Sequence, residues 1–209
     1  MKAFLRNSLQ AVLDFVLKIL ASPESVGPET FLAAFSAANH WLDFSTHTFI
    51  PHEGFMTQVF TYLAMGDLLV HGSVVSLKCT KIIKKLLVKS KFAKMLENVS
   101  SWKEAFGSVP VREQKFLELV VKYLKDNAPR FIAGSKNSDV EHDEDFLLKY
   151  NKILSVLCNN YEYLFTAEET RSSYGVVLFE LMIVATRANN LRLSFEMLQI
   201  WCDLHSTFS

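Results

Sequence analysis

A segment near the C-terminus holds the side-chain types of a nucleophilic catalyst. Cys202, Asp203 and His205 follow one another closely, and nucleophilic catalysis needs a thiol or hydroxyl beside a histidine that an acid orients. The periodicity around these residues is helical, however, and neighbours on one helix rarely reach the geometry of a catalytic triad. We therefore expect Cys202 to pack between helices beside Trp201, and we predict no catalytic residue.

Histidines gather in a second segment, which raises the question of a metal site. His40, His47 and His52 lie close together, and His71 follows. A zinc site of this kind would need two histidines on one helical face together with a third ligand. His40 and His47 are seven residues apart, but we expect their helix to end near Phe44, and no HExxH motif is present. The sequence predicts exposed or capping histidines and no metal.

The remaining motifs of small-ligand chemistry are also missing. The acidic run at 139–145 lacks the central glycine and the closing glutamate of an EF-hand. No loop of the form GxGxxG or GxxxxGK[ST] is available to hold a phosphate. We therefore expect no cofactor and no enzymatic activity, and we assign the polar stretch 134–144 to a flexible loop.

Lysines form the one asymmetric electrostatic feature. Seven lysines and no acid fall in the seventeen residues 78–94. Four of them share one helical face, which we call the lysine face: Lys78, Lys81, Lys85 and Lys89. The face opposite to it is expected to carry Leu77, Ile83 and Leu87. Two interpretations stay open: a solvated outer face, or a contact for an acidic partner or RNA phosphate, although the lack of interleaved aromatic residues weakens the RNA option.

Composition narrows the class of protein. Of the 209 residues, 50% are apolar, and 22 basic residues balance 22 acidic ones. Such a chain is not disordered, and its zero net charge implies no bulk attraction to nucleic acid or to an anionic membrane. The three cysteines form no CxxC motif, which fits a reducing compartment. The most apolar run, 175–186, is too short to span a bilayer. We therefore expect a protein of the nucleus and cytoplasm without membrane insertion.

The hydrophobic periodicity is helical along almost the whole chain. Only seven glycines and five prolines interrupt it, which indicates few and long elements. We expect about ten helices and no strand, with a bend or interruption at Pro129. The helical segments are 1–22, 29–44, 53–65, 74–88, 91–106, 111–132, 145–165, 174–188 and 191–208.

Two arrangements fit these helices: a closed bundle, or a solenoid of helix pairs. A solenoid repeats its sequence pattern about every 40 to 47 residues. The segments 38–44 and 198–204 both contain Trp-x-Asp, and Trp41 and Trp201 are 160 residues apart, which equals four units of 40. This internal similarity supports a solenoid.

Two segments resemble one protein family. The segment 35–63 resembles a repeat of the karyopherin-β nuclear transport receptors, and of the exportins in particular. The matching residues of this first segment and of the helix after it are Trp41, Phe44, Ile50, Pro51, Glu53, Cys79 and Ile82. The segment 187–204 resembles the exportin pattern Ser-x-x-x-Leu-x-[IY]-Trp-x-x-Leu. Its matching residues are Ser194, Leu198, Ile200, Trp201 and Leu204.

The resemblance implies a fold and a function. The fold would be a right-handed α-solenoid of antiparallel helix pairs (HEAT or armadillo-like repeats), with 1–209 as one segment of a much longer chain. The helices at 31–44, 74–88, 145–165 and 191–208 would form the outer layer, and those at 53–65 and 174–188 the inner layer. The function would be to bind protein cargo, GTP-bound Ran, or both. Partner contacts are expected at the lysine face and at Glu53, Gln58, Glu180 and Arg187.

Two alternatives stay open beside this interpretation. A HEAT or armadillo-like interaction scaffold without a role in transport would show the same packing pattern. A helical enzyme or a closed regulatory bundle would require a pocket with convergent polar groups, and the sequence offers no set of residues for one.

Overall fold

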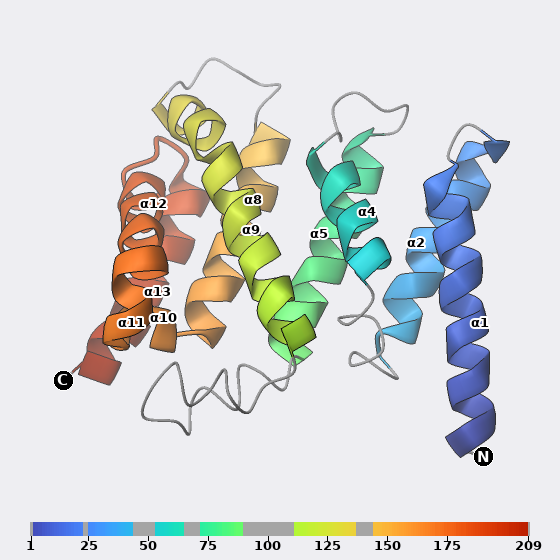
Figure 1. Ribbon diagram of the computed structural model, residues 1–209. Coiled ribbons are helices and arrows are strands. Elements are labelled where there is room, and N and C mark those ends of the chain that lie inside the picture. The colour runs from blue at the N-terminus through green and yellow to red at the C-terminus, as the bar shows by residue number, and fades with distance from the viewer. Residues whose placement is uncertain are drawn as a thin grey trace. The chain divides into compact units, whose positions relative to one another are not determined.

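The computed structural model describes residues 2–22, 25–43, 53–64, 72–89, 111–136 and 144–208. Within these ranges the chain is helical and contains no strand, which confirms the predicted all-α class. The chain divides into two compact units, which we call unit 1 (Met1–Lys89) and unit 2 (Ser90–Ser209). Figure 1 shows that long helices lying side by side build each of them.

The four described helices of unit 1 lie at the corners of a square. They are α1 (Lys2–Ala21), α2 (Pro28–Trp41), α4 (Glu53–Ala64) and α5 (Gly72–Lys89). Extended helix contacts join α1 to α2, α4 to α5, α1 to α4, and α2 to α5. The second helix of the square therefore lies beside the fourth, whereas α1 and α5 are diagonal to each other.

Aromatic rings fill the centre of unit 1. Tyr62 of α4 contacts Phe31 and Phe35 of α2, with ring centroids 5.1 and 5.9 Å apart, in edge-to-face geometry. Its hydroxyl donates a hydrogen bond to the carbonyl of Leu20 at the end of α1. An apolar stripe at spacings of four and three, formed by Phe31, Phe35 and Ala38 of α2 and by Leu42 just after it, is buried. Proline at the first helical position (Pro28) and Glu29 in the first turn favour the start of this helix.

Unit 2 repeats the same pattern of contacts. Its long helices are α8 (Val111–Lys136), α9 (Glu144–Asn160), α12 (Val176–Thr186) and α13 (Leu191–Phe208). Extended contacts join α8 to α9, α12 to α13, α8 to α12, and α9 to α13, with a further contact from α9 to α12. Three short elements separate α9 from α12: α10 (Tyr163–Thr166), α11 (Glu168–Thr170) and the π-helical turn η4 (Arg171–Gly175).

Buried polar contacts hold the pairs of unit 2 in register. The Tyr150 hydroxyl of α9 donates to the Leu124 carbonyl of α8 at 2.6 Å, and burial raises the pKa of this phenol. The Trp201 indole Nε1 of α13 donates to Thr186 Oγ1 of α12 at 3.0 Å. Asn190 caps α13, since its side-chain oxygen accepts the backbone N–H of Arg192 at 3.0 Å.

The structure differs from the sequence-based expectation around Pro129. The predicted end of this helix at 132 and loop start at 134 are wrong, because α8 continues through Pro129 to Lys136. Proline cannot donate one of the backbone hydrogen bonds of the helix, but the packing of the residues that follow Pro129 favours the helix. Phe131 stacks on Tyr150 at 4.3 Å between ring centroids, and Gly134 lies against Leu147. Glu144 already belongs to α9, and residues 137–143 lie outside the described ranges.

The predicted helix 145–165 is also divided. It ends as α9 at Asn160, and the chain turns at Tyr161 and Glu162 before α10. The turn η4 then brings Gly175 close to α10, where a Cβ atom on Gly175 would lie 2.8 Å from the Leu164 carbonyl oxygen. Only glycine permits this approach. The helix expected at 91–106 lies outside the described residues.

Candidate partner-binding surface

The lysine face lies on α5, and its residues differ in environment. Lys81 and Lys89 are exposed, whereas Lys78 and Lys85 are half-buried. Of the residues expected opposite to it, Ile83 and Leu87 are fully buried, but Leu77 is 43% exposed. The expectation for Leu77 is therefore wrong. Leu77 is three residues from Val74 and four from Lys81, which places it in the outward stripe of α5 instead of in the core.

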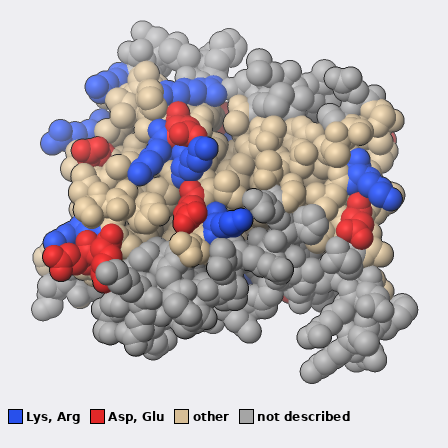
Figure 2. All heavy atoms as spheres, viewed as in Figure 1, with Lys and Arg blue, Asp and Glu red and all other residues tan. Residues whose placement is uncertain are grey.

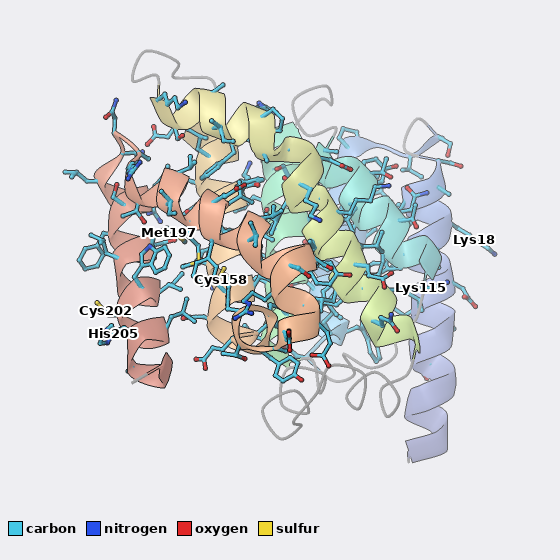
Figure 3. The ribbon with its side chains drawn as sticks, turned by 60° about the vertical axis from the view of Figure 1, so that its left-hand side comes forward. Lys18, Lys115, Cys158, Met197, Cys202 and His205 are labelled. Carbon is cyan, nitrogen blue, oxygen red and sulfur yellow. The ribbon has the colours of Figure 1, made fainter. Side chains whose placement is uncertain are left out.

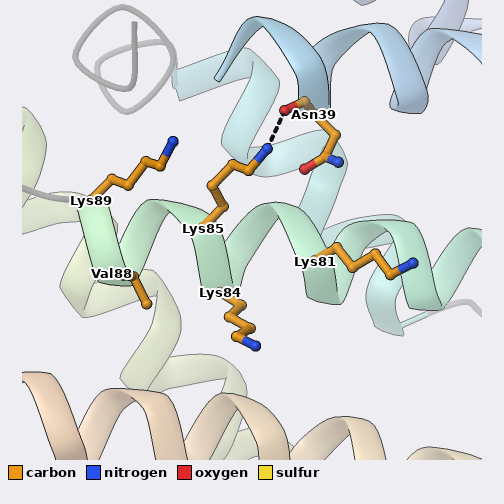
Figure 4. A pocket seen from close by; sticks show the side chains of 6 residues that line it. All are labelled: Asn39, Lys81, Lys84, Lys85, Val88 and Lys89. Carbon is orange, nitrogen blue, oxygen red and sulfur yellow. Dashed lines mark hydrogen bonds between the residues drawn. The ribbon is translucent and has the colours of Figure 1, made fainter. Parts of the chain in front are cut away.

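Lys85 caps the end of α2. The last carbonyl groups of a helix lack partners within the helix and carry partial negative charge. Two of these carbonyls have backbone partners: the Ala38 carbonyl accepts the N–H of Leu42, and the His40 carbonyl accepts the N–H of Asp43. The Lys85 ammonium donates to the Asn39 carbonyl at 2.6 Å, as Figure 4 shows. A cation from α5 therefore satisfies a third carbonyl at this end.

Two further lysines connect α5 to α2. The Lys78 ammonium donates to the Ser36 hydroxyl, and the Lys89 ammonium donates to Asp43 Oδ1 at 2.6 Å. Lys85 contacts the other carboxylate oxygen of Asp43 at 2.8 Å. We call Asn39, Asp43, Lys85 and Lys89 the Asp43 cluster. Three of the four residues of the lysine face are thus engaged within unit 1.

The Asp43 cluster stabilises the ionised carboxylate. The hydrogen bond from Lys85, and then that from Lys89, lower the pKa of Asp43 from 3.8 to about 2, although burial opposes the shift. The side chain of Asp43 is 47% exposed, so solvent and salt screen the attraction. The cluster fixes the position of α5 on α2 more than it holds charge for an external partner.

A different face of α5 is open to solvent. Five exposed residues follow one another at alternating spacings of three and four, which places them on one side of the helix. We call them the exposed face of α5: Val74, Leu77, Lys81, Lys84 and Val88. The three apolar members are 40, 43 and 48% exposed. Lys81 and Lys84 form no ion pair with any residue that the structure describes.

A shallow hollow of about 350 Å³ adjoins this face. Its lining consists of Asn39, Lys81, Lys84, Lys85, Val88 and Lys89. Figure 4 shows that Lys84 and Val88 point away from α2, whereas Lys85 points toward it. Ammonium groups beside an apolar side chain suit a partner that presents carboxylates next to apolar residues. Lys84 belongs to the lysine-rich segment 78–94. Val74, Leu77 and Val88 were not predicted as contact residues, although their three-and-four spacing joins them to Lys81 and Lys84.

The other predicted contact residues fall into two groups. Gln58 is half-buried on α4 of unit 1, and Glu53 begins the same helix, but its side chain lies outside the described residues. Glu180 and Arg187 belong to α12 and its end in unit 2, and both are exposed. They are seven residues apart and share one side of α12 with Ile183, which is 41% exposed.

Charges of both signs mix on the surface. On the face that Figure 2 displays, basic and acidic side chains lie among each other and form no large patch of one sign. This distribution agrees with the equal numbers of basic and acidic residues. The surface therefore favours local, geometrically specific contacts over long-range electrostatic attraction.

The residues first considered for catalysis and metal binding lie apart from these surfaces. Cys202 is exposed, so the expectation that it packs between helices is wrong. Figure 3 places Cys202 and His205 on the side of α13 opposite Met197. His40 Nδ1 donates to the Ser36 carbonyl at 2.7 Å. No group of three potential metal ligands occurs among the described residues, whereas His47, His52 and His71 lie outside them.

None of the described helices combines the length and the apolar character required to cross a lipid bilayer.

Comparisons with known proteins identify no relative. No family model, no curated protein and no solved structure matches the chain. The functional interpretation therefore rests on the geometry of the two units and on the residues of their surfaces.

Replacing Lys85 tests the capping role. We expect Lys85→Ala to lower the free energy of unfolding by about 1 kcal/mol, because it leaves the Asn39 carbonyl without its cation in a partly exposed site. Lys81→Ala is the matched control on the same helix and should change it by less than about 0.5 kcal/mol. Urea unfolding measures the free energy of unfolding of both variants. Equal losses for the two variants would contradict the distinction between the Asp43 cluster and the exposed face.

The lowered pKa of Asp43 predicts that the stability of the fold depends on pH. The folded-state pKa of Asp43, about 2, lies below its ordinary value of 3.8. The ionised carboxylate therefore stabilises the fold at any pH above 3.8, and this stabilisation is lost as the pH falls toward 2. Wild type should therefore melt at a higher temperature than Asp43→Asn near neutral pH, and the two melting temperatures should converge near pH 2. Thermal unfolding across this range tests it. A difference that does not change with pH would show that the Asp43 charge has no role.

Proposed function

We propose that this chain is a helical-repeat module that acts by binding other proteins. The observation that carries the proposal is that the same four contacts join the long described helices in both units, although unit 2 adds a contact between α9 and α12. In each, the first helix pairs with the second and the third with the fourth, while first packs on third and second on fourth. One arrangement of four helices thus occurs twice in 209 residues.

Stacked helical hairpins produce this pattern of helix contacts. In an up-and-down bundle the first and fourth helices are neighbours, and the second and fourth are diagonal. In a solenoid each hairpin lies on the previous one in the same orientation, so that equivalent helices contact each other. We therefore propose a right-handed α-solenoid of antiparallel pairs. The contacts of α2 with α5 and of α9 with α13 agree with the layers expected from the sequence.

The resemblance to karyopherin-β receptors supplies the class of partner. We propose that the chain is an exportin-like segment of a nuclear transport receptor, which moves between nucleus and cytoplasm and binds protein cargo, GTP-bound Ran, or both. A solenoid can change curvature because each repeat contacts only its neighbours. Partners that prefer different curvatures then promote or oppose each other's binding.

The exposed face of α5 is the surface best suited to a partner. Its two lysines are free of ion pairs with described residues, and apolar side chains flank them at both ends. Among the described residues that line the adjoining hollow none is aromatic, so this lining does not offer bases a stacking platform. An acidic amphipathic protein segment fits this chemistry better than RNA. Gln58, Glu180 and Arg187 remain as further contact positions.

A scaffold of HEAT or armadillo-like repeats without a role in transport is the second candidate. It is favoured by the nature of the residues that carry the resemblance, because several of them are packing residues. Cys79, Ile82, Ile200 and Leu204 are buried, and Trp201 contacts α12. Residues of this kind specify how repeats stack, and any protein built from such repeats needs them.

Binding to Ran distinguishes the two candidates. We expect the purified chain to be captured by immobilised Ran locked in the GTP form and not by Ran in the GDP form. Capture by neither form, or equally by both, would contradict the binding of GTP-bound Ran by this segment and would favour the scaffold.

Charge reversal in the same assay locates the surface. We expect Lys81→Glu with Lys84→Glu to reduce capture by about tenfold, which corresponds to about 1.4 kcal/mol. Lys122→Glu with Lys136→Glu is the matched control, because both of these lysines are exposed on α8. Equal capture of the two double variants would exclude the exposed face of α5 from the contact.

A further inference from the structure

We infer that Lys81 and Lys84, on the exposed face of α5, bind one phosphorylated side chain of a protein partner. The two ammonium groups hold its phosphate together, as those of Lys85 and Lys89 hold the carboxylate of Asp43. The inference rests on the proposed function, because it takes this face as the surface for a protein partner. It adds the chemical class of the residue that the surface selects.

The Asp43 cluster shows how two lysines of α5 bind one anion. Lys85 and Lys89 are four residues apart, so about one turn of the helix separates them. Their ammonium groups contact the two different carboxylate oxygens of Asp43, at 2.8 and 2.6 Å. The hydrogen bonds from Lys85 and Lys89 lower the pKa of Asp43 to about 2. A pair of lysines one turn apart on this helix therefore stabilises an anion placed between them.

Lys81 and Lys84 form a second pair of this kind. They are three residues apart, which makes them neighbours on the helix surface. Both side chains are exposed, and neither forms an ion pair with any residue that the structure describes. Figure 4 shows that Lys84 points away from α2, whereas Lys85 points toward it. The second pair thus offers an anion from another molecule the contacts that the first pair makes with Asp43.

The balance of charge around the second pair favours a phosphate over a carboxylate. All four lysines line the hollow of about 350 Å³, and of the described residues Asp43 alone pairs with them, as a single negative charge. A phosphorylated side chain carries about two negative charges at neutral pH and three acceptor oxygens. A carboxylate carries one charge on two oxygens. Phosphate can therefore neutralise Lys81 and Lys84 together and accept hydrogen bonds from both.

Apolar side chains on either side of the pair favour a protein segment over free phosphate or RNA. Leu77 lies four residues before Lys81, and Val88 lies four residues after Lys84; these two side chains are 43 and 48% exposed. A segment with apolar residues around its phosphorylated residue can cover both of them, whereas a phosphate ion covers neither. Among the described residues that line the hollow none is aromatic, so RNA bases gain no stacking contact from this lining.

Fluorescence anisotropy with three labelled peptides tests the preference for phosphate. The peptides share one sequence, with leucine four residues before and after a central position that holds serine, glutamate or phosphoserine. We expect the phosphoserine peptide to bind the purified chain about tenfold more tightly than the glutamate peptide, and the serine peptide to bind most weakly. Equal affinity of the phosphoserine and glutamate peptides would overturn the inference and leave the proposed binding of proteins in place.

Replacing the lysine pair tests where the phosphate binds. We expect Lys81→Ala with Lys84→Ala to reduce the preference for phosphoserine over glutamate to less than about twofold, with unchanged circular dichroism because both side chains are exposed. Lys122→Ala with Lys136→Ala is the matched control on α8 and should keep the full preference.

Three outcomes of these measurements overturn the inference. They are an unchanged preference in the Lys81 and Lys84 variant, no binding of any of the three peptides, and binding of pyrophosphate or of a uridine oligonucleotide as tight as that of the phosphoserine peptide. The capture assay with Ran judges the transport function separately, because it contains no phosphorylated peptide.

Discussion

The packing of helix pairs on one another is the constraint on which this structure depends. Two helices alone cannot bury the apolar side that faces away from their own contact, and a second pair in the same orientation covers it. In unit 1 the rings of Phe31, Phe35 and Tyr62 fill the space between the pairs. In unit 2 Phe131 of α8 stacks on Tyr150 of α9 within one pair.

Stacking also decides which charges are available to partners. Placing α5 beside α2 brings Lys85 and Lys89 to the end of α2, where the Asn39 carbonyl and the Asp43 carboxylate accept their hydrogen bonds. Lys78 donates to the Ser36 hydroxyl within α2. A set of lysines that looks like a binding surface in the sequence therefore acts in large part within the fold. The side of α5 turned away from α2 keeps Lys81 and Lys84 for contacts with other molecules.

Local sequence patterns predicted the helices, and contacts between distant residues decided the rest. The helical periodicity of apolar residues was sufficient to predict a helix at 29–44, which the structure contains as α2. Pro129 favours a break in the helix, but the packing of Phe131 and Gly134 outweighs the lost hydrogen bond. Asp43 and Lys85 are 42 residues apart, and no pattern in a single sequence pairs two such charges. Lys81 and Lys84 could therefore not be separated from the engaged lysines before the helices were placed.

Cross-linking between the second and fourth helices of each unit tests the stacked arrangement most directly. In a background with Cys202→Ser, cysteines at Asp43 and Lys89 join α2 to α5, and cysteines at Lys152 and Glu196 join α9 to α13, where the wild-type side chains form ion pairs. A short bifunctional thiol reagent should link both pairs within one chain, and it should not link cysteines at Lys18 and Lys84 on the diagonal helices α1 and α5. Linkage of the diagonal pair without linkage of the other two would show an up-and-down bundle and contradict the account.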